Sequence, residues 1–564
     1  MSNHRNLFFC TIMVLLLSIS LLSAIPIVGA EASRTIYVVT NTNSTGAGSL
    51  RQAILDANGH SGYDYIYFDI PTTDPGYDSV LGVWFIDLTI VLPMLEDLDG
   101  LGIYGSTQPG THPYLPGVIL RGTSLPPGSD IFIIRNGSNT INGLGIFNSQ
   151  GDGIEVDSDT NVIEYNQIFI SERYGINLVA DALKNYAHDN HICGQKLDGI
   201  HLADTSVNTI SYNLIGLQPD YLPSVPVTVG NGISLSGCEI NSISNNTIGS
   251  NGGHGISLSS SDDNLIELNT IGLNVDKDEE RGNGNHGIYI TGSKGNMIYD
   301  NWISGNLSDG IRLEGSLTSG TKIERNKIGT SMHGSAPNHH HGIGIYNGAH
   351  DNYVGRIDNL SYYNVIAYNQ WSGIVVVNES FLDVGYNFIG TNNIYYNQFF
   401  GVHIRNSKGN QIILNKISGN GMAEGNAGVR IENDTGFPDV ADLNLIEYNG
   451  IDNNAGLGIQ LVGDANANIL PPTLSSASCF QVEGSAACGG CFVQIFSDYQ
   501  DEGRVYEDTV TTDSSGNFEW TGLLTGPNVT ATLIDTAGNS SQFSTPIYNA
   551  CLFSHFYYIP MISR

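Results

Sequence analysis

A short pattern of hydrophobic positions, Gly-(Ile/Val)-x-(Leu/Ile/Val), recurs through the middle of the chain. Its copies are spaced by 22 to 33 residues and begin at Gly153, Gly175, Gly199, Gly232, Gly255, Gly287, Gly310, Gly342, Gly373, Gly401, Gly428 and Gly458. A second pattern, N-x-I-x-x-N-x-I, follows many of these copies, for example from Asn241 and Asn264. Such regular recurrence indicates a protein built from stacked repeats.

Each pattern predicts a short β-strand, because its Ile and Leu side chains alternate with residues that face the other way. A strand of four residues cannot bury its apolar face alone, whereas coils stacked about 4.8 Å apart pair their backbone groups and share one interior. Asparagines that recur at fixed places predict ladders of stacked amides inside the bends. Helical and leucine-rich repeats fit poorly, since the repeats have no 3.6-residue period.

The longer intervals contain extra residues at equivalent places. Three insertions follow the N-x-I-G strand, at residues 217–230, 273–286 and 330–341. Because their positions within the repeat are equivalent, we expect all three on the same edge of the stack.

The coil patterns resemble the right-handed parallel β-helices of the pectate-lyase-like superfamily. Near the start, S-L-R-Q-A-I at residues 49–54 is similar to the S-L-R-x-A-I cap of exported bacterial β-helix proteins of the CSLREA type, with Gly48 and Gln52 replacing the family's Cys and Glu. Residues 50–57 have an amphipathic helical pattern, and we expect this helix to cover the open end of the solenoid. The resemblance implies the fold but not one activity, since members range from carbohydrate enzymes to adhesins.

The coil pattern stops where proline returns, at Pro471 and Pro472. The following segments alternate apolar and polar residues between turn clusters, which predicts an antiparallel β-sandwich of about 75 residues. G-N-F at 516–518 and the stretch 530–543 resemble bacterial Ig-like modules. We therefore expect an all-β chain: a right-handed parallel β-helix solenoid with an N-terminal cap and a small C-terminal β-sandwich.

The first residues resemble an export signal. Arg5 precedes an apolar run from residue 7 to about residue 29, and Ala30-Glu31-Ala32 follows as a cleavage pattern. An uncleaved membrane anchor is the alternative, which Pro26 disfavours. The predicted division is a signal peptide (1–32), a cap with the first coils (33–130), the β-helix (131–468), an Ig-like sandwich (469–548) and a C-terminal tail (549–564).

Composition narrows the class of protein. The 564 residues include 68 glycines, which disfavours a helical protein, and the net charge of −33 disfavours a nucleic-acid partner. No segment after the signal peptide predicts a membrane span, so we expect a secreted or cell-envelope protein. Disulfides are the expected state of its cysteines in an exported chain, while the CxxC spacing at residues 488–491 also suits a metal. The six cysteines outside the signal peptide are Cys193, Cys238, Cys479, Cys488, Cys491 and Cys551.

The residue before the repeated glycine changes from coil to coil. Six consecutive coils carry Asp198, Asn231, His254, His286, Asp309 and His341 there. Such a column suits metal binding or acid–base chemistry. If the strand continued through the glycine, however, these side chains would face inward, where a polar ladder satisfied by its own neighbours explains them equally well.

His254 from this column and the nearby Arg312 lie in stretches that resemble motifs of a known class of enzyme. G-H-G-I-S-L around His254 resembles the G-H-G-I-S-I stretch of polygalacturonase-type glycosidases, and Arg312 lies in G-I-R-L, which resembles their R-I-K motif. Asn231 stands where that class carries its paired aspartates, so inverting hydrolysis would lack its acid. The catalytic candidates are Asp198, His254, Asp309 and Arg312.

Metal candidates come from an insertion and from the column. Asp276, Asp278 and Glu279 form an acidic insertion that suits Ca²⁺, with a solvated loop as the alternative. His286 and His341 complete the set of candidate ligands. We assign no cofactor beyond this possible calcium.

Two functions follow. The leading hypothesis is a secreted or cell-surface β-helix that binds polysaccharide or another surface, as an adhesin does. The alternative is a carbohydrate-active enzyme, either a lyase or a hydrolase of acidic polysaccharide. Whether the chain is an enzyme stays open at this point, as does its oligomeric state.

Overall fold

The computed structural model describes residues 34–549, except 181, 358–360, 380–384, 424, 435, 437–439 and 501. The predicted signal peptide lies outside the described residues, as does the predicted tail apart from Asn549. One α-helix, α1 (Leu50–Asn58), and two short 3-10 helices, η1 (Gly105–Thr107) and η2 (Ala465–Asn468), accompany the strands of this part of the chain. None of the described residues belongs to a helix with the length and hydrophobicity that a membrane crossing requires.

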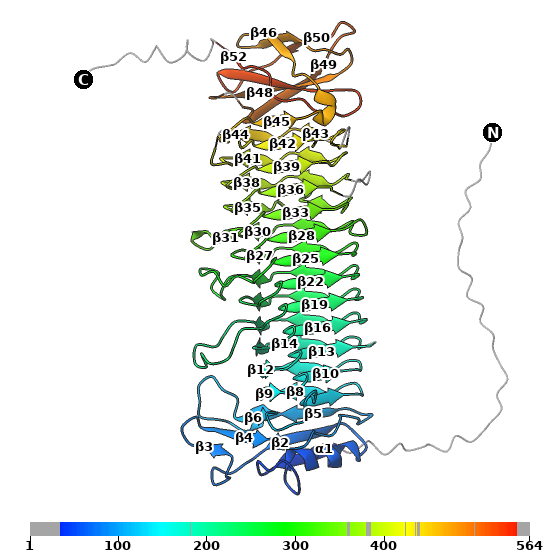
Figure 1. Ribbon diagram of the computed structural model, residues 1–564, viewed down its shortest axis with the longest axis vertical. Coiled ribbons are helices and arrows are strands. Elements are labelled where there is room, and N and C mark those ends of the chain that lie inside the picture. Colours follow the sequence, from blue (N-terminus) through cyan, green and yellow to red (C-terminus); the bar gives the residue numbers. More distant parts are fainter. Residues whose placement is uncertain are drawn as a thin grey trace, which may run out of the picture.

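Three long sheets run along the solenoid, and from β7 onward each coil contributes to all three of them (Figure 1). Sheet A contains β1 (Ile36–Val39), β2 (Asp64–Phe68), β5 (Leu101–Tyr104), β8 (Thr140–Asn142), β11 (Val162–Glu164), β14 (Tyr186–His188), β17 (Thr209–Ser211), β20 (Ser242–Ser244), β23 (Leu265–Glu267), β26 (Met297–Tyr299), β29 (Lys322–Glu324), β34 (Tyr353–Val354), β37 (Phe388–Gly390), β40 (Gln411–Ile413) and β43 (Leu445–Glu447).

Sheet B follows sheet A in each coil. It contains β3 (Tyr77–Asp78), β4 (Val83–Asp87), β6 (Val118–Arg121), β9 (Leu144–Ser149), β12 (Gln167–Ser171), β15 (His191–Cys193), β18 (Leu214–Ile215), β21 (Thr247–Ile248), β24 (Thr270–Ile271), β27 (Trp302–Ile303), β30 (Lys327–Ile328), β35 (Val365–Ala367), β38 (Asn393–Tyr395), β41 (Lys416–Ser418) and β44 (Gly450–Asp452). Its first pair, β3 with β4, is antiparallel.

Sheet C is formed by the Gly-Ile-x-Leu strands. It contains β7 (Phe132–Ile134), β10 (Ile154–Val156), β13 (Ile176–Val179), β16 (Ile200–Ala203), β19 (Ile233–Ser236), β22 (Ile256–Ser259), β25 (Ile288–Thr291), β28 (Ile311–Glu314), β33 (Ile343–Tyr346), β36 (Ile374–Val377), β39 (Val402–Arg405), β42 (Val429–Glu432) and β45 (Ile459–Val462). The insertions lie between sheets B and C and project from one edge (Figure 1), as predicted; one carries the hairpin of β31 (Thr330–Ser331) and β32 (Gly334–Ser335).

The interior is a stack of aligned aliphatic side chains. Ile256 on β22 is aligned with Ile233 on one side and Ile288 on the other, and all three are fully buried. The glycine before each strand has no side chain because none would fit: a Cβ on Gly255 would lie 2.6 Å from both the Gly287 carbonyl oxygen and Ile271 Cγ2. The repeated glycine therefore allows the chain to bend into sheet C against a filled core.

Ladders of asparagine line the corners of the coils, as the sequence predicts. In the ladder between sheets A and B, Asn246 Nδ2 donates to Asn269 Oδ1 at 3.0 Å and to the Ile210 carbonyl at 2.9 Å. Asn269 Oδ1 also accepts from the Asn246 backbone N–H at 2.9 Å. Each amide thus joins two coils and satisfies backbone groups that the bend leaves inside the solenoid.

Helix α1 covers the N-terminal end of the stack (Figure 1), in the position the sequence predicts. Ser49 caps it, because its side chain accepts from the Gln52 N–H. Its apolar face, which includes Leu50 and Ile54, packs into the solenoid core, while the Arg51 side chain reaches the Val91 carbonyl. Ser49 and Arg51 therefore fix this helix in place.

Two antiparallel sheets cover the C-terminal end (Figure 1). The first contains β46 (Thr473–Ala477), β47 (Gln481–Ser485) and β50 (Asn517–Thr521), and the second contains β48 (Phe492–Asp498), β49 (Val505–Thr511), β51 (Asn528–Ile534) and β52 (Ile547–Tyr548). They enclose a core of their own that includes Val482, Ile495 and Trp520. The predicted resemblance to Ig-like modules stays a prediction.

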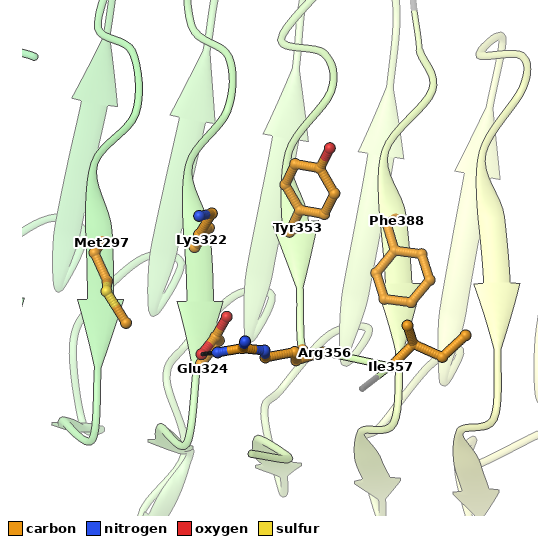
Figure 2. Close-up of a pocket in the computed structure, with 8 residues that line it drawn as sticks. Met297, Lys322, Glu324, Tyr353, Arg356, Ile357 and Phe388 are labelled. Carbon is orange, nitrogen blue, oxygen red and sulfur yellow. Dashed lines mark ion pairs between the residues drawn. The ribbon is translucent and has the colours of Figure 1, made fainter. Parts of the chain in front are cut away.

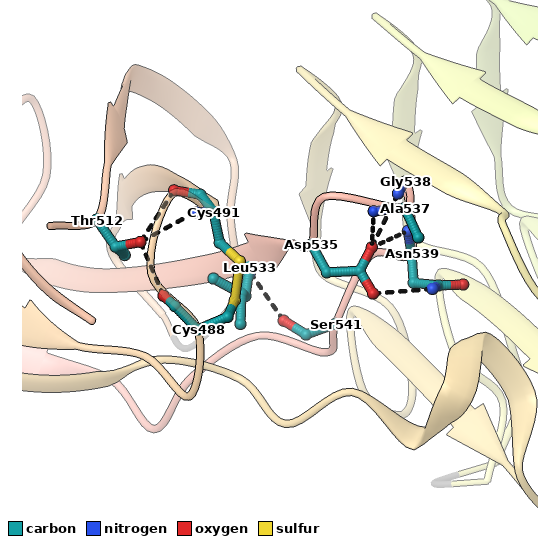
Figure 3. The surroundings of a disulfide bond; sticks show 9 residues. All are labelled: Cys488, Cys491, Thr512, Leu533, Asp535, Ala537, Gly538, Asn539 and Ser541. Carbon is teal, nitrogen blue, oxygen red and sulfur yellow. Dashed lines mark hydrogen bonds between the residues drawn. A yellow bond between two sulfur atoms is a disulfide. The ribbon is translucent and has the colours of Figure 1, made fainter. Parts of the chain in front are cut away.

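The cysteines divide into two groups. Cys488 and Cys491 form a disulfide beside Thr512 (Figure 3), so the CxxC pair holds no metal, and Cys479 is disulfide-bonded as well. Cys193 and Cys238 are free thiols, so the expectation of disulfides is wrong for both. Each is buried in a different coil, and burial raises the pKa of Cys193 to about 12, which keeps it protonated.

Replacing Ile256 with Asp should lower the free energy of unfolding by more than about 4 kcal/mol, because it buries an unpaired carboxylate between two aliphatic neighbours. Ser259→Asp, at an exposed position of the same strand, should change it by less than about 0.5 kcal/mol. Urea unfolding followed by circular dichroism measures both. Equal effects of the two variants would contradict the inward direction of Ile256.

Candidate functional site

The residues before the repeated glycines form one column beside sheet C. Their backbones pair from coil to coil: the Gly255 N–H donates to the His286 carbonyl, and the Gly287 N–H to the Asp309 carbonyl, each at 3.0 Å. A Cβ on the repeated glycine would point into the core, so the side chain of the residue before it points away from the core. The inward orientation considered from the sequence is therefore wrong. His254 instead lies against the outward residue Tyr289.

Asp309 is the centre of a cluster of titratable side chains and is fully buried, with 0% of its surface exposed. His340 Nδ1 lies 3.1 Å from Asp309 Oδ1, and the His341 backbone N–H donates to the same oxygen at 3.0 Å. Asp309 Oδ2 has no hydrogen bond, although an Arg312 nitrogen lies 3.5 Å away. Unpaired buried polar atoms are uncommon, and they occur often at functional sites.

Arg312 is held in place by Glu314 and Tyr346. Its Nε donates to Glu314 Oε2 at 2.9 Å, and its guanidinium lies 3.9 Å from the centre of the Tyr346 ring. The Tyr289 hydroxyl donates to the same Glu314 oxygen at 3.3 Å. The cation is therefore oriented toward Asp309 by a network that occupies the outward positions of β25, β28 and β33.

Two histidines and a tyrosine form a stack beside this network. The rings of His254 and His286 lie 5.2 Å apart with an interplanar angle of 8°, and His254 lies 4.8 Å from Tyr289. His286 Nδ1 accepts from the Asp309 backbone N–H at 3.1 Å, whereas His254 Nδ1 is buried without a hydrogen bond. A ladder satisfied by its own neighbours therefore does not explain His254.

The electrostatics keep the histidines neutral and the carboxylates charged. Burial lowers the pKa of His254, His286 and His341 to about 4. Burial alone would raise the pKa of Asp309, but the hydrogen bond from His340 and the neighbouring imidazoles bring it below its ordinary value. The hydrogen bond from Arg312 lowers the pKa of Glu314.

An aromatic edge borders the cluster where the chain enters sheet C. Trp371 is 43% exposed and lies 4.4 Å from the ring of His340. Phe399, which is 40% exposed, stacks on Trp371 at 5.3 Å. These rings extend the cluster along the solenoid axis by two coils.

The structure brings together part of the predicted set. Arg312 lies beside Asp309, and His254 joins them through the stack with His286. Asp198 does not join them: its Oδ2 accepts from the Ser234 hydroxyl at 2.6 Å, away from the centre of the cluster.

The sequence analysis did not single out Glu314, Tyr346 or Trp371. Glu314 and Tyr346 are the fourth residues of their strands, which period-2 alternation places outward. That alternation in the sequence could have predicted the outward direction of Glu314 and Tyr346. Trp371 precedes its strand, so no such pattern predicts its position.

The metal candidates do not assemble into a site. The predicted acidic insertion is a loop in which Asp278 bonds to Asn274 and Glu279 pairs with Arg281. Its acidic residues, including Asp276, are absent from the groups of at least three potential ligands among the described residues.

Asp309, His340 and His341 do form such a group. However, His341 Nδ1 accepts from the Ser372 backbone N–H, and His286 Nδ1 is likewise used by Asp309. A neutral ring whose Nδ1 accepts a hydrogen bond carries its proton on the other nitrogen, so neither imidazole offers a lone pair to a metal.

A second acidic group, Asp130, Asp152 and Glu155, lies at the N-terminal side of sheet C. Burial raises the pKa of Asp130 to about 6. Arg135 pairs with Glu155 at 2.8 Å, and Arg173 lies 3.6 Å from Asp152. Two arginines thus offset part of the charge of this group.

Comparison with known proteins agrees with this architecture. A family model described as a right handed beta helix region matches residues 225–356. The chain is a right-handed parallel β-helix. A search of curated proteins gives no significant match.

Three solved structures illustrate the similarity of other proteins to this β-helix. The Dettilon tailspike protein is 13% identical, with a TM-score of 0.42, over 91% of this chain and 92% of its own. The A-module of a mannuronan C-5 epimerase from Azotobacter vinelandii is 13% identical, with a TM-score of 0.34, over 69% and 96%. A DFA-IIIase from Arthrobacter chlorophenolicus is 13% identical, with a TM-score of 0.35, over 67% and 94%. We draw no functional conclusion from these likenesses.

The buried histidines predict a loss of stability in mild acid. A free imidazole has a pKa near 6.5, so between about pH 6.5 and pH 4 the unfolded chain binds more protons than this β-helix, and stability falls as the pH falls. Replacing His254 with Asn should make the loss between pH 7 and pH 5 smaller by about 2 kcal/mol. Urea unfolding at both pH values measures this, and an unchanged pH dependence would contradict the low pKa.

Proposed function

We propose that the protein is exported and binds a polysaccharide along the outward face of sheet C. The observation that carries this proposal is the exposed edge of Trp371 and Phe399 beside the hydrogen-bonding groups around Asp309. Sugar rings have apolar C–H faces and polar hydroxyls, so they suit a surface that offers aromatic carbon next to fixed donors and acceptors. Stacked coils also repeat this surface along an axis, which suits an extended polymer.

Trp371→Ala should weaken binding of a recognised polysaccharide by about tenfold, because the edge loses its largest aromatic ring. Affinity gel electrophoresis on a panel of neutral and acidic polysaccharides measures the effect. Tyr186→Ala is the matched control, since Tyr186 is an exposed aromatic residue on sheet A. Equal loss in both variants, or no binding by the unmodified protein, would contradict this placement.

A second candidate function is catalysis on an acidic polysaccharide, and the unpaired Nδ1 of His254 favours it. A neutral imidazole has one unprotonated nitrogen that can act as a general base, and Arg312 is a cation suited to a uronate carboxylate. Hydrolysis fits less well, because Asp309 and Glu314 both have lowered pKa values and neither is a general acid. The geometry therefore favours a lyase, in which a base takes the proton beside the carboxylate, a carbon–carbon double bond forms, and the bond to the leaving oxygen breaks.

His254→Ala distinguishes the two candidates. If His254 is the base, the variant should lose at least about 99% of lyase turnover, while its melting temperature should fall by only a few degrees because it loses ring stacking but no hydrogen bond through Nδ1. Ultraviolet absorbance of the unsaturated product and thermal unfolding measure the two quantities. A folded variant with unchanged turnover would exclude His254 as the base, and Ser259→Ala, at an exposed position of the adjoining strand, is the control.

A further inference from the structure

A second candidate site lies on another sheet, away from the cluster around Asp309. A cavity of about 440 Å³ opens on the outward face of sheet A (Figure 2). Its floor comes from successive strands, with Met297 on β26, Tyr353 on β34 and Phe388 on β37. The chain leaving β34 closes one side with Arg356 and Ile357. A volume in the range of roughly 300–1,000 Å³ is typical of small-molecule sites.

The floor of this cavity is an exposed apolar surface. Tyr353 is 45% exposed and Ile357 is 53% exposed. The rings of Tyr353 and Phe388 lie 6.3 Å apart at an angle of 40°, and both are presented side by side in Figure 2. Exposed aromatic and aliphatic carbon that is gathered in one concavity favours a bound partner with an apolar face.

Positive charge borders the same cavity. Lys322 is exposed on β29 and makes no ion pair or side-chain hydrogen bond within the described part of the chain. Arg356 lies 4.0 Å from Glu324, which is buried (Figure 2). The cavity lining therefore holds two cations, Lys322 and Arg356, and one carboxylate, in a chain with 55 acidic and 22 basic residues.

We propose that this cavity binds an anionic sugar unit, namely a pyranose ring that carries a carboxylate or a sulfate. The C–H face of the ring packs on Tyr353 and Phe388, and the anion pairs with Lys322. The negative net charge of the chain does not prevent this, because carboxylates beyond about 8 Å are screened at physiological salt. This site is independent of the proposed glycan surface on sheet C.

Isothermal titration calorimetry of the full chain with three probes tests the proposal. Oligogalacturonate carries carboxylates, a dextran sulfate oligomer carries sulfates, and a neutral dextran oligomer carries neither. At least one charged probe should bind, at least about tenfold more tightly than neutral dextran, and its affinity should fall as salt rises. Which charged probe binds more tightly identifies the anion. Equal binding of all three probes, or no binding, would overturn the proposal.

Variants locate the binding. Lys322→Gln and Tyr353→Ala should each weaken the preferred probe about fivefold, and Lys322→Arg should retain most of the affinity. Lys294→Gln, at an exposed lysine outside the cavity, is the matched control and should leave affinity unchanged, as should Trp371→Ala on sheet C. Both Lys322 variants replace an exposed side chain, so they should keep the native melting temperature. Loss of binding in Trp371→Ala with full binding in Lys322→Gln would assign the ligand to sheet C and overturn the proposal.

Discussion

The asparagine ladders are the interaction on which the rest of this structure depends. Every coil turns sharply at its corners, where backbone carbonyl groups point into the solenoid. Several corner residues take the left-handed conformation, such as Leu268 (φ 57°) and Arg325 (φ 59°). That conformation costs a residue with a side chain roughly 1 kcal/mol. The amide that follows offsets the cost: Asn269 and Asn326 each bond to the next coil and to backbone groups.

The ladders also hold successive coils in one register, and this register creates the site. Asp309, His286 and His341 are separated by more than twenty residues in sequence, yet they occupy adjacent coils because each precedes the glycine of its own strand. Burial between neighbouring coils then excludes water, which lowers the pKa of the histidines and leaves the carboxylate dependent on Arg312 and His340. This outward column is therefore buried and shielded from water, as a protein core is.

The outward faces of sheets A and C have become different surfaces on one scaffold. On sheet C, the side chains satisfy one another around Asp309 and leave only a few atoms unpaired. On sheet A, Tyr353 is exposed and Phe388 is half-buried, and both line a cavity beside Lys322. Both arrangements are possible because the core and the ladders carry the stability, so outward positions are free to vary.

The sequence by itself determined the strands, the inward isoleucines, the ladders, the end helix and the column of His254, His286 and Asp309, since all of these follow from local periodicity and stacking. It did not determine the direction of that column, because the bend at each glycine depends on the core that Ile271 and its equivalents fill. The sequence also did not predict the ion pair of Arg312 with Glu314, the free thiol of Cys193, or the cavity that Tyr353 lines. Those outcomes depend on which coils become neighbours and on where each connection returns, and only the tertiary structure decides them.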